Sequence, residues 1–109
     1  MTESEIRQTI DRMVRRIAEH FQPEKIILFG SHARGNAGPD SDVDLLVVMR
    51  IDGSRRDKAT DIDRALGDRE LPLDVLVVTP EDVERYRDAV GSIIYPALRQ
   101  GRVLYDRAA

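Results

Sequence analysis

The residues in this sequence that are best suited to carry out chemistry are a glycine-serine turn and a pair of aspartates. Gly30 and Ser31 follow the apolar segment 26–29, and Asp42 and Asp44 stand two residues apart at the head of a second apolar segment. Side chains two apart on a strand point to the same face, so both carboxylates would be displayed together. Carboxylate oxygens suit magnesium, and a glycine turn lets phosphate approach the backbone. These parts predict a site for magnesium and a nucleoside triphosphate, and hence phosphoryl-type transfer.

The turn has further features of a phosphate-binding segment. Gly30 can adopt a positive φ, and a short helix beginning at Ser31 or His32 would aim free amides at a phosphate. The Ser31 hydroxyl can donate to a phosphate oxygen, and Arg34 lies one helical turn further on. A glycine-serine pair alone is usually an ordinary turn with a surface arginine, so this interpretation depends on the aspartates. His32 is interpreted as a loop or helix-start residue near the site that could touch the nucleotide, and not as a metal ligand, because no other histidine lies nearby.

A third aspartate supports the metal-site interpretation. Asp74 interrupts the apolar run from Leu71 to Val78, where a buried strand would not ordinarily place a charge. If the strand around Asp74 pairs beside the strand around Asp44, the three carboxylates form one site. Like carboxylates this close resist joint ionisation, and a divalent cation relieves the repulsion. The alternative for Asp42 and Asp44 is a solvated acidic start of a strand.

The elements that must position these residues alternate along the chain. Apolar spacing and turn residues predict helices at about 3–20 and around 59–66, strands at 25–29, 42–49 and 73–78, a helix beginning at Pro80, a helical piece around 93–98 and an edge strand at 103–105. Thr2 with Glu5 can form a capping box, and Thr79 can cap the helix that begins at Pro80. Pro96 leaves the helical piece open, because a proline beyond the first turn would kink it. The pattern predicts one α/β domain spanning residues 1–109.

Composition narrows the class of protein. The chain has 109 residues, of which 41% are apolar, and this is the size of one ordinary domain. It has no cysteine, which excludes disulfides and thiolate zinc sites. The short apolar runs predict a soluble, cytoplasmic protein without membrane association. A net charge of −3 argues against a general nucleic-acid binder, so an anionic ligand must be held locally.

The motif spacing resembles a known family. Gly30-Ser31, ten intervening residues and Asp42-Val43-Asp44, with Ala33-Arg34-Gly35 between them and an aspartate on a later strand, resemble the polymerase-β-type nucleotidyltransferase superfamily. More narrowly, the chain resembles the minimal nucleotidyltransferases, antitoxin partners of HEPN-domain toxins. The resemblance covers nearly the whole chain and implies an α+β fold, a mixed β-sheet packed with helices.

The resemblance also implies the roles of individual residues. By that similarity Gly30 and Ser31 bind the triphosphate, Asp42 and Asp44 hold two magnesium ions, and Asp74 ligates one metal and activates the attacking hydroxyl. The expected site therefore comprises three catalytic, metal-binding aspartates and three nucleotide-binding residues, namely Asp42, Asp44 and Asp74, and Gly30, Ser31 and Arg34.

The implied function is transfer of AMP from ATP to a tyrosine hydroxyl of a HEPN ribonuclease toxin, which the modification silences. The two proteins are then expected to form a hetero-oligomer. Two alternatives remain open: an antitoxin that only covers its toxin, and a nucleotidyltransferase acting on a small molecule. The three aspartates favour the enzyme, because a pure binding module has no reason to keep clustered carboxylates. The chain length favours a protein acceptor, because it leaves no room for a further substrate-binding domain.

Overall fold

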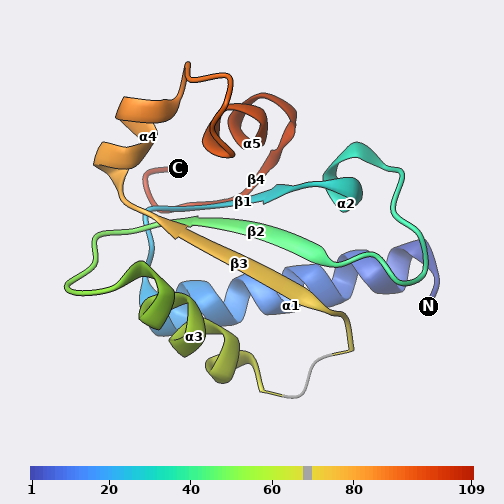
Figure 1. Cartoon of the computed structure of the whole chain (residues 1–109). Coiled ribbons are helices and arrows are strands. Elements are labelled where there is room, and N and C mark those ends of the chain that lie inside the picture. The colour runs from blue at the N-terminus through green and yellow to red at the C-terminus, as the bar shows by residue number, and fades with distance from the viewer. Residues whose placement is uncertain (68–69) are drawn as a thin grey trace.

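Four runs of apolar and β-branched residues form a single sheet in the computed structural model, which describes residues 1–67 and 70–109 (Figure 1). The strands are β1 (Lys25–Phe29), β2 (Val43–Val48), β3 (Leu73–Val78) and β4 (Arg102–Asp106), and they lie in the order β3-β2-β1-β4. β1 pairs antiparallel with both β2 and β4, whereas β2 and β3 run parallel. The sheet is therefore mixed, which confirms the expected fold.

The pairing register brings three strand ends to one end of the sheet. Phe29, the last residue of β1, lies opposite Asp44 on β2, and Asp44 lies opposite Asp74 on β3. The carboxyl end of β1 thus meets the amino ends of β2 and β3. The expected pairing of the strand around Asp74 beside the strand around Asp44 is confirmed.

Two helices cover one face of the sheet. α1 (Glu3–Phe21) begins with the predicted capping box of Thr2 and Glu5, and α3 (Arg55–Leu66) begins at the Ser54 cap. Their apolar sides meet alternate residues of the strands, and the shared core includes Ile10, Met13, Val14, Ile17, Ile26, Leu28, Val43, Leu45, Val47, Ile62, Leu66 and Val77. Figure 1 shows α1 and α3 on the same side of the sheet.

The helices α4 (Pro80–Tyr86) and α5 (Ile94–Gln100) lie on the opposite face. A second apolar cluster joins them to the sheet through Ile27, Leu46, Val48, Val78, Ile94 and Ala97. Pro96 is the third residue of α5, and the helix tolerates it because amides of the first turn have no intrahelical partner. After α5 the chain passes very close to β1, because a Cβ added to Gly101 would lie 2.7 Å from Ile27 Cγ2.

The element bounds follow the sequence prediction with small shifts. β1 and β3 match it, β2 leaves Asp42 just outside its first residue, and α3 begins at Arg55, earlier than its apolar residues indicated. In the described part of the chain, no helix combines the length and apolarity needed to cross a membrane.

Candidate active site

β1 ends in a turn that requires glycine. Gly30 has φ 74° and ψ −157°, a combination that residues with a side chain rarely adopt. A Cβ added at Gly30 would also overlap the Asp44 carboxylate oxygen Oδ2. The predicted short helix follows as α2 (Ser31–Arg34), which ends at Gly35 with φ 80°. The backbone of the turn therefore lies directly against a carboxylate of β2.

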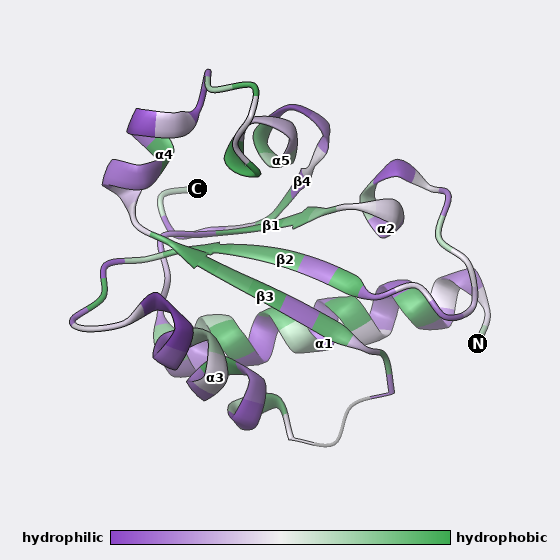
Figure 2. Cartoon of the chain, in the orientation of Figure 1, coloured by the Kyte–Doolittle hydropathy of each residue, from purple (hydrophilic) through white to green (hydrophobic). Residues whose placement is uncertain are grey.

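Asp44 and Asp74 form the central pair of the site. They are register partners on adjacent parallel strands, so their side chains point to the same face. That face carries α4 and α5, since Leu46, two residues after Asp44, packs in the cluster with Ile94. In Figure 2 the hydrophobic strands β2 and β3 each carry one hydrophilic band, and the charged residue of each strand is its aspartate. Asp44 is half-buried, whereas Asp74 is exposed on the edge strand.

The electrostatics of this end of the sheet centre on Asp44. Partial burial raises the pKa of the Asp44 carboxyl above its ordinary value, and repulsion from Asp74 and Asp42 raises it further. The positive charges of His32 and Arg34 act in the opposite direction. The turn, α2 and the three aspartates are thus close enough to interact electrostatically. A cation at this position would be favoured because it relieves the carboxylate repulsion.

Asp42 stands beside this pair but outside the sheet. Its side chain is exposed, and the strand begins one residue later. Within residues 1–67 and 70–109, no three acidic or histidine side chains converge closely enough to form a ready-made metal site. The structure therefore brings Asp44 and Asp74 together and places Asp42 near them, while the set of three metal ligands remains a prediction.

The remaining nucleotide-binding candidates lie on α2. Ser31 is half-buried, and its carbonyl accepts a hydrogen bond from the Asn36 amide at 3.1 Å. Arg34 is exposed, and among the described residues its guanidinium has neither a hydrogen bond nor an ion pair. This exposed guanidinium, one helical turn after the Gly30 turn, is available to an anion.

His32 makes a contact that the sequence did not predict. Its Nε2 lies 3.2 Å from the Ser41 carbonyl oxygen, across the loop that leads to Asp42. A histidine at the start of a short helix gives no sequence signal for such a contact, because the path of an irregular loop does not follow from periodicity. The sequence therefore places His32 only near the site.

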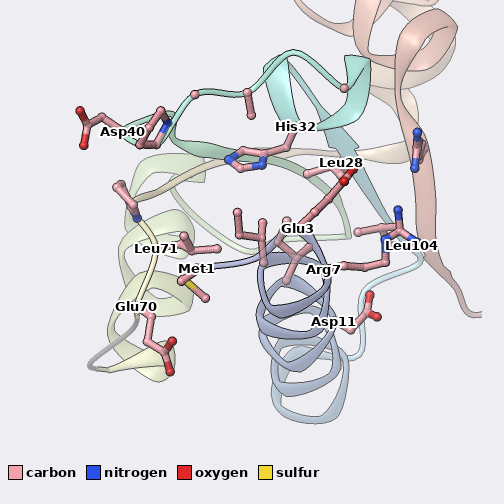
Figure 3. A pocket seen from close by; sticks show the side chains of 18 residues that line it. Met1, Glu3, Arg7, Asp11, Leu28, His32, Asp40, Glu70, Leu71 and Leu104 are labelled. Atoms are coloured by element: carbon pink, nitrogen blue, oxygen red, sulfur yellow. The ribbon is translucent and has the colours of Figure 1, made fainter.

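A cleft of about 1050 Å³ lies behind the turn, against the face that α1 covers (Figure 3). Apolar side chains of α1, β1 and β4 line it, including Ile10, Leu28 and Leu104, and His32 reaches it from α2. None of the six expected site residues lines this cleft. The carboxylates project from the opposite face of the sheet, so the cleft is separate from the candidate active site.

The comparisons with known proteins agree with this fold. The family model described as the nucleotidyltransferase domain matches residues 10–95, and the chain belongs to this family. A Methanocaldococcus jannaschii protein named “Putative protein adenylyltransferase” is 30% identical over 119 aligned positions, which cover 98% of this chain and 76% of that protein. The family resemblance seen in the sequence is thereby confirmed.

Solved structures share the fold at low identity. The crystal structure of a “putative nucleotidyltransferase from Sulfolobus solfataricus” aligns with a TM-score of 0.68 at 19% identity, covering 97% of this chain and 85% of that one. A chain from the structure of a tri-AMPylated Shewanella oneidensis HEPN toxin in complex with MNT antitoxin aligns with a TM-score of 0.56 at 17% identity, covering 94% and 73%. A toxin-antitoxin structure with AMP-PNP gives a TM-score of 0.60 at 20% identity, covering 88% and 73%.

Proposed function

We propose that this chain is a magnesium-dependent adenylyltransferase that transfers AMP from ATP to a tyrosine hydroxyl of a HEPN-domain ribonuclease and so neutralises that toxin. The observation that carries the proposal is the Asp44–Asp74 register pair held against the Gly30 turn. The named activity of the Methanocaldococcus relative and the toxin-antitoxin assemblies among the structural neighbours support it.

The residues fit magnesium by their chemistry. Carboxylate oxygens are the hard ligands that magnesium prefers. Burial raises the pKa of Asp44, and repulsion from Asp74 and Asp42, which a cation would relieve, raises it further. In the proposal Asp42, Asp44 and Asp74 hold two ions. Bound magnesium would neutralise charge on the triphosphate and on the departing pyrophosphate.

The chain's own residues would position the two reactants. The backbone at Gly30 and the Ser31 hydroxyl would hold phosphate oxygens, and the Arg34 guanidinium would add charge. The tyrosine oxygen would attack the α-phosphorus as its proton passes to the Asp74 carboxylate, and the bond to the β-phosphate oxygen would break to release pyrophosphate. Asp74 is exposed on an edge strand, so a hydroxyl carried by another protein can approach it.

The test is intact-mass spectrometry of the HEPN partner co-expressed with variants of this chain. We expect wild type to add one or more adenylyl groups and Asp44→Ala to add none, while co-purification of the two proteins persists. Asp40→Ala is the matched control, because Asp40 is an exposed aspartate of the preceding loop and should leave transfer intact. An unmodified partner with wild type, together with full neutralisation by Asp44→Ala, would support the binding-only antitoxin instead.

A further inference from the structure

We propose that His32 is a positioning residue that holds the backbone of Asp42 in place relative to Asp44 and the Gly30 turn. Its effect on metal use rests on the proposed function, whereas its effect on the loop does not. The inference starts from the hydrogen bond between His32 Nε2 and the Ser41 carbonyl oxygen, whose two atoms lie 3.2 Å apart.

The direction of this hydrogen bond follows from the acceptor. A carbonyl oxygen only accepts, so the Nε2 atom of His32 must carry the proton. Both the neutral ring protonated at Nε2 and the charged ring satisfy this requirement, and the bond therefore does not depend on the charge of the ring.

The bond matters because of the peptide group that it holds. The Ser41 carbonyl belongs to the peptide group that precedes the Cα of Asp42. The peptide group that follows this Cα is held by the Val43 amide, which donates to the Pro72 carbonyl at 2.8 Å. Both peptide planes beside Asp42 are thus fixed from other segments, one from α2 and one from the residues that precede Asp74.

Little else in the described structure attaches this loop to the rest of the protein. Residues 34–40 are all exposed, and Asp42 lies outside the β2 ladder. Within the loop, the Gly38 amide donates to Ser41 Oγ at 2.8 Å, and the Ser41 amide donates to the Gly38 carbonyl at 3.2 Å. These two bonds close a local turn but do not attach it to the sheet. The hydrogen bond from His32 to the Ser41 carbonyl attaches the loop to α2 immediately before Asp42.

The surroundings of the ring separate this role from contact with substrate. His32 is half-buried and lines the cleft on the α1 face, where Figure 3 shows its ring among the cleft side chains. The carboxylates project from the other face. His32 therefore acts on the site through the backbone that carries Asp42, apart from the electrostatic interaction of its ring with the Asp44 carboxyl.

The experiment compares variants that differ in their capacity to donate. His32→Phe keeps a planar ring but lacks the donor, His32→Ala removes the ring, and His32→Gln places an amide donor near the position of Nε2. Hydrogen exchange of the free protein reports on residues 38–43, and ATP binding across a magnesium titration reports on the site. His20→Gln is the matched control, because the exposed His20 ring forms its hydrogen bond in the described part of the chain with the Arg16 carbonyl of its own helix.

We expect His32→Phe and His32→Ala to speed exchange at the Val43 amide about fivefold, the factor for one ordinary hydrogen bond. The magnesium concentration that gives half-maximal ATP binding should rise about tenfold, as for loss of a group that orients a metal ligand. His32→Gln should restore both values to within about twofold of wild type, and His20→Gln should change neither.

Unchanged exchange in both donor-free variants would overturn the inference, and so would a His32→Gln variant as impaired as His32→Phe. If wild type bound no ATP at any magnesium concentration, the proposed function would fail. The exchange data on residues 38–43 would still decide the positioning role.

Discussion

Replacing Gly30 with alanine should destabilise the protein in two ways, through the backbone conformation at this position and through a steric clash with Asp44. The backbone there has φ 74° and ψ −157°, and a Cβ would overlap Asp44 Oδ2. Holding alanine in this backbone conformation alone should lower the unfolding free energy by about 1–3 kcal/mol. Moving the Asp44 side chain off its rotamer adds about 0.5–1.5 kcal/mol. For a domain of this size, each kcal/mol lowers the Tm by about 4–8 °C.

Gly67 provides a matched control for the cost of placing alanine in this backbone conformation. It has φ 58° and ψ −139°, close to the values at Gly30, and among residues 1–67 and 70–109 no atom beyond its chain neighbours lies within 4 Å of an added Cβ. Gly67→Ala should therefore show the backbone cost alone. The excess loss in Gly30→Ala reports the contact with Asp44.

The assay pairs thermal melts of both variants with the proposed adenylyl transfer to a HEPN-domain partner. Gly67→Ala should keep full transfer at temperatures where it is folded. Gly30→Ala should lose transfer even where melts show it folded, because the new Cβ displaces the carboxylate from its place opposite Asp74. Equal stability losses in the two variants, with transfer intact in both, would refute the reasoning.

Two further predictions concern stability. In a denaturant titration, Leu46→Ala should lower the unfolding free energy by about 2–5 kcal/mol, because Leu46 is fully buried where β2 packs against α5. The control Val90→Ala changes a side chain that is 75% exposed, and it should alter the unfolding free energy by less than about 0.5 kcal/mol. Without metal, Asp44→Asn should stabilise the protein at about pH 7 by on the order of 0.5 kcal/mol, because the raised pKa of Asp44 means that folding disfavours its charged form. This gain should shrink as the pH falls through the raised pKa and vanish below the ordinary value of 3.8, so a gain that persists in melts at about pH 3 would contradict the electrostatic assignment.

The features predicted well from the sequence are those that local rules decide. The capping box at Thr2, the cap at Thr79 and the strand runs of β1 and β3 depend on neighbours within a few residues, and the structure has them at those positions. α5 begins within one residue of the predicted helical piece, but the sequence left open whether Pro96 would kink it. In the structure Pro96 is the third residue of α5 and thus lies in the first turn, where a proline is tolerated.

The candidate site divides in the same way. The side-by-side placement of Asp44 and Asp74 followed from the pattern once the pairing of their strands was assumed, but the register itself is a long-range property. The link from His32 to Ser41 and the contact of Gly30 with Asp44 depend on loop path and on distances of a few ångströms, which residue spacing does not encode.

The parallel register of β2 and β3 also ties correct folding to the presence of the site. A slip of β3 by one residue would turn its side chains to the opposite faces of the sheet. Asp74 would then point toward the α1 and α3 core, where an unpaired carboxylate is costly, and Val77, which is 2% exposed, would leave that core. A misaligned strand is therefore penalised by the same aspartate that the aligned strand presents to solvent. A residue proposed for catalysis thus also disfavours a shifted register of β3. Asp74→Val would remove both the carboxylate and the free-energy cost of burying it in the shifted strand.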